Sequence, residues 1–199
     1  MEVSVDKVKT LRDRTGAGIM DCKKALAESG GGIDAAIEYL RKKGIAKASK
    51  FVSRKAGEGL VYAYIHPGSR IGVLIEVNCE TDFVARTDEF QNLANDLALQ
   101  VAATAPLALT RDEVGPDIVD KEREIYRSQA LEQGRPEGVI DRIVEGKLEK
   151  FFEEVCLLEQ VYVKNPEIKV GDLVKEVAGK VGENVIVRRF ARFQLGEKS

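Results

Sequence analysis

Few side chains in this sequence are of the types that carry out catalysis. The one histidine, His66, follows a strand-like segment and lies at a turn. The three cysteines are far apart and form no CxxC pair: Cys22, Cys79 and Cys156. A zinc site needs four clustered ligands, so we expect no bound metal. We interpret the cysteines as reduced thiols that serve as small core residues.

Sequence motifs of the common enzyme classes are also missing. The sequence has no GxSxG, HExxH or Walker A motif. Gly30-Gly31-Gly32 has the glycines of a phosphate loop, but no strand pattern precedes it and no Lys-Thr pair follows, so it is better explained as a helix terminator. The residue types therefore indicate a binding protein that is not an enzyme and uses no cofactor.

One segment is harder to explain by structure alone. Residues 78–86, with the sequence Asn-Cys-Glu-Thr-Asp-Phe-Val-Ala-Arg, follow an expected strand. Functional groups are often presented at strand ends and in loops. Phe83 is either a core residue beneath the sheet or an exposed contact, and Thr81 is either a helix cap or a contact. Taken alone, the residue types favour the structural interpretation, and both stay open.

Apolar residues near the N-terminus recur at helical spacing and predict three short amphipathic helices. The three stripes are Val5, Val8 and Leu11; Ile19, Cys22, Ala25 and Leu26; and Ala36, Ile37 and Leu40. We expect the Ser4 side chain to cap the first helix, Gly16 to end it, and Gly44 to end the third. Residues 1–50 are therefore predicted to form a three-helix domain.

The N-terminal part of the chain is basic, although the whole chain has a net charge of −2. Residues 1–57 carry 13 basic and 7 acidic groups, whereas residues 58–199 carry 18 basic and 26 acidic groups. Such asymmetry indicates two regions with different surfaces. We interpret residues 51–58 as a basic connector, which either meets an acidic partner or is simply a solvated linker.

Residues 59–199 contain three strand patterns. Leu60 to His66 and Ile71 to Val77 are rich in β-branched and aromatic residues, and Pro67-Gly68-Ser69 between them predicts a hairpin. A third strand is expected at Val185 to Phe193. Three strands with one buried face need helices to cover them.

Helical patterns in the same region supply that cover. The first is expected to begin with Asp88 as its cap and to end at Pro106, and others are expected over 117–133, 137–155 and Val170 to Val181. The sequence therefore predicts an α+β core domain at 59–199, in which helices pack around a small three-stranded antiparallel sheet.

Several short blocks resemble the sequences of the elongation factor Ts family. They are Val8 to Arg12, Thr15 to Leu26, Ala36 to Arg41, Lys43-Gly44, Tyr64 to His66, Arg70 to Leu74, Glu76 to Arg86, Leu157 to Gln160, Gly182 to Val185 and Arg188 to Phe190. Any single block is weak, but together they run in order from near residue 5 to near residue 193.

The resemblance implies a fold and a function. The fold is an N-terminal three-helix domain like those that associate with ubiquitin (UBA-like), followed by a core named for dimerisation. The function is that of a guanine-nucleotide exchange factor, which promotes GDP release from the translational GTPase elongation factor Tu. That partner holds GDP by a phosphate loop and a magnesium ion. Exchange requires no proton transfer, which agrees with the missing catalytic residues.

The resemblance also implies which residues bind the partner. Thr81, Asp82, Phe83 and Val84 match the segment that dislocates the magnesium ion, with Phe83 as an apolar wedge and Asp82 beside the magnesium region. A large, rigid aromatic ring suits such a wedge. Further partner contacts are implied at Val181, Gly182, His66 and Met20. For Gly182 the alternative is a helix C-cap.

The same resemblance bears on assembly and location. Longer family members carry two copies of the core and an inserted coiled coil, whereas this chain has room for one copy. A homodimer would restore the second surface by two-fold symmetry. The chain lacks an apolar run of about 18 residues, and residues 1–9 lack the apolar segment of a secretory signal, so we expect a cytoplasmic protein without membrane contact.

Three other functions stay open at this point. A helical module that binds a ubiquitin-like fold or a nascent chain would need only the first 44 residues and leaves residues 78–86 unexplained. An RNA-binding protein would use the basic connector, but its basic residues are not interleaved with aromatic ones, so we expect no direct nucleic-acid binding. A hydrolase without a recognisable motif is the least favoured.

Overall fold

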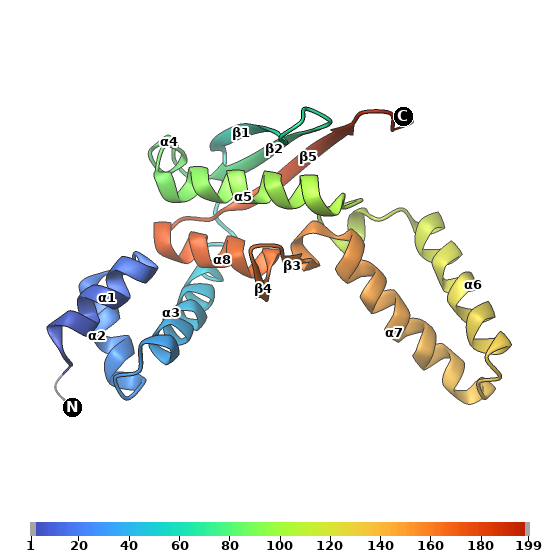
Figure 1. Ribbon diagram of the computed structural model, residues 1–199, viewed down its shortest axis with the longest axis horizontal. Helices are drawn as coiled ribbons and strands as arrows, with labels where there is room; N and C mark the ends of the chain where they lie inside the picture. Colours follow the sequence, from blue (N-terminus) through green and yellow to red (C-terminus); the bar gives the residue numbers. More distant parts are fainter. Residues whose placement is uncertain (1–2, 198–199) are drawn as a thin grey trace. The chain divides into compact units, whose positions relative to one another are not determined.

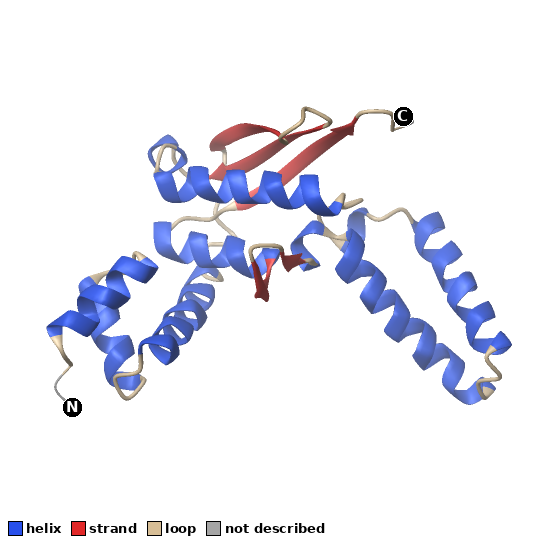
Figure 2. Cartoon of the chain, viewed as in Figure 1, coloured by secondary structure: helices blue, strands red, loops and turns tan. Residues whose placement is uncertain are grey.

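A computed structural model of the chain describes residues 3–197, so residues 1–2 and 198–199 at the ends of the two expected domains lie outside the described part. Its helices and its three-stranded antiparallel sheet confirm the predicted α+β class (Figure 2). Contacts within the chain group into two units. The first consists of Met1–Leu60, Val77–Leu93 and Val174–Ile186, and the second of Val61–Glu76, Ala94–Leu173 and Val187–Ser199.

The first unit begins with the three predicted helices, α1 (Val5–Thr15), α2 (Ile19–Glu28) and α3 (Ile33–Ala48) (Figure 1). The apolar stripes meet in a small core whose fully buried members are Leu11, Cys22, Ala25, Leu26 and Ala36. Gly16 ends α1 with a φ of 66°, a left-handed conformation that glycine adopts without steric cost. The predicted three-helix arrangement is therefore confirmed, although Val5 and Ile19 of the predicted stripes are exposed rather than buried.

Two predictions about the ends of these helices are wrong. Ser4 precedes α1, but its side chain makes no capping hydrogen bond, and only its backbone carbonyl accepts the Val8 amide at 3.2 Å. Gly44 does not end α3, which continues to Ala48. A glycine inside a helix costs about 1 kcal/mol relative to alanine. The Gly44 backbone lies so close to Gly179 of α8 that a Cβ on Gly179 would clash with it, whereas a Cβ on Gly44 would not.

The sheet has the strand order β1-β2-β5, with β1 at Glu58–Ile65, β2 at Ile71–Cys79 and β5 at Ile186–Gln194. The predicted hairpin is confirmed, because the His66 amide donates to the Ile71 carbonyl at 2.9 Å. Along β2, buried and more exposed residues alternate, as expected for a strand with one face on the core.

Helix α5 (Asp88–Thr104) follows the predicted pattern, with Phe90, Leu93, Leu97 and Val101 all buried. Its predicted cap is wrong by one residue. The hydroxyl of Thr87, rather than the Asp88 carboxylate, accepts the Phe90 amide at 3.4 Å. The same hydroxyl donates to the Val84 carbonyl at 2.8 Å, so Thr87 both closes the preceding turn and opens α5.

The second unit contains a helical hairpin of α6 (Pro116–Glu132) and α7 (Glu137–Val155), which lie side by side (Figure 1). Its buried seam consists of Ala130, Ile140, Val144 and Leu148. A short antiparallel ribbon of β3 (Val161–Tyr162) and β4 (Asn165–Lys169), which the sequence patterns did not predict, precedes α8 (Val170–Val181). No described helix combines the length and apolar character needed to cross a membrane.

Candidate functional site

Phe83 projects from a single helical turn, α4 (Asp82–Ala85), which the sequence patterns did not predict. Its side chain is 78% exposed, whereas the next two residues, Val84 and Ala85, are 6% and 8% exposed. Successive residues of a helix point about 100° apart, so burying Val84 and Ala85 turns Phe83 outward. The interpretation of Phe83 as a core residue is therefore wrong.

Thr81 fixes the start of this turn. Its hydroxyl accepts the Val84 amide at 3.3 Å, which confirms the interpretation of Thr81 as a helix cap. The same hydroxyl donates to Glu183 Oε1 at 2.7 Å. The other carboxylate oxygen of Glu183 accepts two amides, from Glu80 at 3.0 Å and from Thr81 at 3.1 Å. One carboxylate thus receives three hydrogen bonds from the residues just before Phe83.

In a second set of bonds, the side chain of Glu80 is the acceptor and the residue after Glu183 is the donor. The Asn184 amide donates to Glu80 Oε1 at 2.7 Å, and Arg54 Nη1 lies 3.5 Å from the same oxygen. The Asn184 side chain, which is 5% exposed, donates to the carbonyls of Val52 and Arg54 at 3.3 and 2.7 Å. These bonds join the segment before Phe83, the turn after α8 and the expected connector, and we call them the clasp.

Asp82 faces solvent beside Phe83. Its carboxylate pairs with Arg86 at 2.6 Å, and both side chains are well exposed. An exposed ion pair contributes about 0–1 kcal/mol, because water screens the two charges. The Asp82 carboxylate is therefore available to exchange its partner at little cost.

The remaining predicted contacts lie on several elements. Val181 is half-buried at the end of α8, and Gly182 follows it with a φ of 80°, its amide donating to the Ala178 carbonyl at 2.9 Å. Gly182 is thus a helix C-cap. It directly precedes Glu183, so the clasp brings this turn to the Thr81–Val84 segment. Met20, 76% exposed on α2, belongs to the three-helix bundle instead.

His66 belongs to the second unit, at the tip of the β1–β2 hairpin. Its Nδ1 lies 3.0 Å from the hydroxyl of Tyr64. It is exposed and has no nucleophile or carboxylate among its described hydrogen-bond partners.

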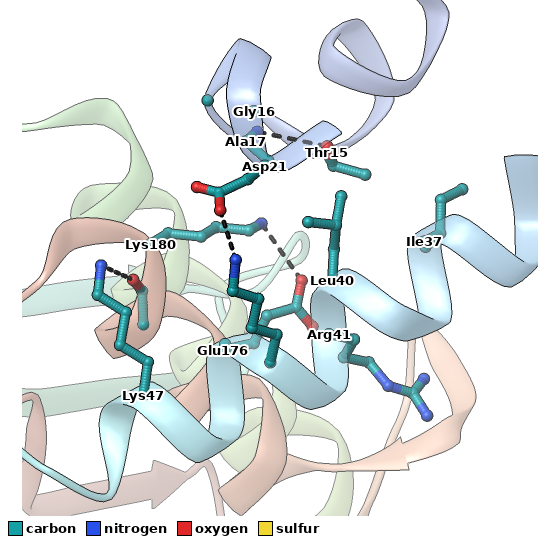
Figure 3. Close-up of a pocket in the computed structure, with 14 residues that line it drawn as sticks. Thr15, Gly16, Ala17, Asp21, Ile37, Leu40, Arg41, Lys47, Glu176 and Lys180 are labelled. Carbon is teal, nitrogen blue, oxygen red and sulfur yellow. Dashed lines mark hydrogen bonds and ion pairs between the residues drawn. The ribbon is translucent and has the colours of Figure 1, made fainter. Parts of the chain in front are cut away.

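An open cavity of about 330 Å³ lies in the first unit between the α1–α2 loop, α3 and α8 (Figure 3). Most of the charged groups drawn around it are paired: Lys43 Nζ lies 2.6 Å from Asp21, and Lys180 Nζ 3.3 Å from Glu176. The hydrogen bond from Lys43 holds the pKa of Asp21 below its usual range. Beside the cavity, Lys47 donates to the Gly179 carbonyl at 3.3 Å. Of these three pairs, the bond from Lys47 joins the bundle to α8, whereas the other two lie within the bundle and within α8.

The cysteines do not form a nucleophilic site. All three are buried and free, as predicted. Burial raises the pKa of Cys79 to about 11, with the Glu183 charge as the second cause, and burial likewise raises the pKa of Cys156 to about 11. Among residues 3–197, no group of three or more His, Cys, Asp or Glu side chains could hold a metal ion.

We therefore expect the native thiols to react slowly with a disulfide reagent such as DTNB at pH 8. A thiol with a pKa near 11 is about 0.1% thiolate at that pH, and only the thiolate reacts. In urea all three thiols should react rapidly, because unfolding exposes them and restores ordinary pKa values to Cys79 and Cys156. Rapid reaction of a whole equivalent of thiol in the folded protein would contradict this assignment.

Comparison with known proteins agrees with the resemblance of the short blocks. The family model described as "Elongation factor TS" matches residues 45–197. The chain belongs to the elongation factor Ts family. Three relatives named "Elongation factor Ts" come from Carboxydothermus hydrogenoformans (57% identical, covering 98% of this chain and 90% of the relative), Caldanaerobacter subterraneus subsp. tengcongensis (56%, 98% and 98%) and Herpetosiphon aurantiacus (54%, 98% and 99%).

The family is one of translation elongation factors, so the exposed Phe83 turn is a candidate binding element of such a factor. The elongation factor Ts resemblance singled out the residues of this turn, but sequence reasoning missed the hydrogen bonds of Glu183. The signal available was the Gly182-Glu183-Asn184 block itself. Which backbone amides a carboxylate binds about 100 residues away depends on the tertiary fold, so spacing alone could not reveal it.

Proposed function

We propose that this protein is a guanine-nucleotide exchange factor that releases GDP from elongation factor Tu in the cytoplasm. The observation that carries the proposal is the projection of Phe83, a large apolar side chain, from a turn whose other side is anchored by Val84 and Ala85. An aromatic anchor held in advance binds with little loss of conformational entropy. Membership of the elongation factor Ts family supports the choice of partner.

The proposed mechanism follows from thermodynamic linkage. Backbone amides, a lysine and Mg²⁺ neutralise the phosphates of a nucleotide bound in a phosphate loop. A protein that binds the GTPase more tightly when this cradle is distorted must weaken nucleotide binding by the same factor. A tenfold preference for the empty GTPase corresponds to about 1.4 kcal/mol. No covalent bond is made or broken, so the protein acts by binding and not as an enzyme in the usual sense.

Asp82 and Phe83 have different parts in this proposal. Phe83 inserts between apolar side chains of the GTPase domain and displaces the backbone near the magnesium site. Asp82 brings a negative charge toward that site, where it disfavours the phosphates and competes for the ion. Because the Arg86 pair is exposed and weak, Asp82 can leave it on binding.

The other predicted residues add further contacts with the partner in this proposal. Thr81 and buried Val84 hold the turn, Val181 and Gly182 form a neighbouring contact, and His66 forms a further one. Residues 1–50, the expected three-helix domain with Met20 exposed on α2, grip the GTPase, and residues 51–58 connect them along the chain to the core at 59–199.

The direct test is the release of labelled GDP from elongation factor Tu with and without this protein. We expect strong acceleration by the wild-type protein. The linkage argument also requires tighter binding to nucleotide-free than to GDP-loaded elongation factor Tu. Equal affinity for the two forms would overturn the proposed function, whatever the family.

We further propose that the protein acts as a homodimer, since one chain carries one copy of the core. Four large apolar side chains on the strands of the second unit support this: Val61, Ile65, Leu74 and Phe193 are between 47% and 68% exposed. Leu74 lies between the buried residues Val73 and Ile75, so it points to the face of β2 away from the core. Light scattering that gives the mass of one chain for the free protein, and of one chain per complex with elongation factor Tu, would exclude the homodimer.

A further inference from the structure

Resting on the proposed exchange function, we propose that Glu183 is a positioning residue that holds the Phe83 turn in its binding orientation. The Glu183 carboxylate is hydrogen-bonded to Glu80 and Thr81, the two residues that lead into the turn. It therefore acts through Phe83 rather than as a contact of its own.

The Glu183 carboxylate is an anion that accepts hydrogen bonds from backbone amides. Oε2 accepts the consecutive amides of Glu80 and Thr81, and Oε1 accepts the Thr81 hydroxyl at 2.7 Å. Hydrogen bonds to an ionised acceptor are roughly twice as strong as those between neutral groups. Since α4 consists of only four residues, its own helical bonds are too few to define its direction. The Glu183 carboxylate supplies that definition from outside the turn.

Glu183 is itself held in place. The residue before it, Gly182, caps α8, and the residue after it, Asn184, is buried and bonded to the carbonyls of Val52 and Arg54. The Asn184 amide returns a bond to Glu80 Oε1 at 2.7 Å. The backbone on both sides of Glu183 is thus fixed, so its side chain extends from an anchored point of the chain.

A further bond acts on the same segment. The Cys79 thiol donates to the Thr81 carbonyl at 3.1 Å, so both the amide and the carbonyl of Thr81 are engaged. With its two ends tied at Cys79 and Thr87, the segment has little freedom left except at the exposed side chains of Asp82 and Phe83. Loss of Glu183 removes three of these ties at once.

The test uses Glu183→Gln and Glu183→Ala in the full chain, with Glu145→Gln as the matched control. Glutamine retains one acceptor oxygen and alanine none, so the effect should increase in that order. Glu145 is an exposed carboxylate on α7 that pairs only loosely with Arg123, at 3.5 Å. We expect GDP release to slow roughly tenfold or more in Glu183→Ala, since small misplacements of a reacting or binding group have effects of up to about a hundredfold. The control should release GDP at the wild-type rate.

A coupling measurement separates positioning from a general loss of stability. We expect Glu183→Gln to weaken binding to nucleotide-free elongation factor Tu in the wild-type chain but not in a chain that already carries Phe83→Ala. Hydrogen exchange of the Glu80 and Thr81 amides in the free protein should become faster in both Glu183 variants. This readout does not depend on the partner.

The outcomes distinguish the two proposals. If the wild-type protein accelerates GDP release and both Glu183 variants match it, the positioning role is wrong and the exchange function stands. If Glu183→Gln weakens binding equally with and without Phe83, Glu183 acts elsewhere and the positioning role is again wrong. If the wild-type protein itself does not accelerate release, both proposals fail.

Discussion

Replacing Phe83 by alanine should reduce the acceleration of GDP release by about 30-fold or more while leaving the fold intact. Truncating a central aromatic anchor of an interface costs about 2–4 kcal/mol, which corresponds to a factor of about 30 to 1,000. The folded protein loses little, because the ring is 78% exposed. The measurements are the rate of labelled GDP release and the urea midpoint of Phe83→Ala beside the wild type.

The matched control is the same substitution at Phe90, seven residues along the chain and fully buried. Phe90→Ala should cost about 3–5 kcal/mol of folding free energy, because it removes apolar contacts and leaves a cavity. The urea midpoint should therefore fall clearly for Phe90→Ala and hardly at all for Phe83→Ala. A Phe83→Ala protein that unfolds like Phe90→Ala would mean that the ring supports the core after all. A stable Phe83→Ala protein with the wild-type release rate would exclude the wedge.

The contrast between these two phenylalanines also shows where sequence patterns suffice. Phe90 belongs to a run with Leu93, Leu97 and Val101 at helical spacing, and a periodic stripe predicts both a helix and its buried face. All four residues are buried as predicted. Phe83 belongs to no such stripe, since a single turn is shorter than the period on which the argument depends. The exposure of Phe83 could therefore be established only from the structure.

Helix ends were predicted less well, for a related reason. Capping depends on one hydrogen bond, and a neighbouring residue can supply it equally well, as Thr87 does in place of Asp88. Gly44 illustrates a different limit. A glycine is needed either where the backbone turns or where another segment comes close, and sequence cannot distinguish these two causes. At Gly44 neither cause applies, because α3 continues past it and its own Cβ would come no closer than 3.9 Å to α8; the close approach instead requires glycine at Gly179, some 130 residues further along the chain.

That approach makes Gly179→Ala a strongly destabilising change. A Cβ atom at Gly179 would lie 2.8 Å from the Cα of Gly44 and even closer to its carbonyl oxygen. These are backbone atoms within a helix, so they cannot move aside as a flexible side chain would. We expect a cost of about 1–3 kcal/mol, the usual range for overpacking, and partial loss of the bond from Lys47 to the Gly179 carbonyl. Urea denaturation should detect it as a lower midpoint with an unchanged slope.

Alanine substitutions at two further glycines serve as controls, because they should not destabilise the protein as Gly179→Ala does. Gly146 in α7 has open space where a Cβ would go, so Gly146→Ala should stabilise the protein by about 0.5–1 kcal/mol through helix propensity. Gly44→Ala should also be tolerated, since its own Cβ would come no closer than 3.9 Å to the Glu176 carbonyl oxygen. The contact between α3 and α8 thus needs glycine on the α8 side only. Equal stability of Gly179→Ala and Gly146→Ala would show that α3 and α8 are further apart in solution. The cavity between them would then lose one of its walls.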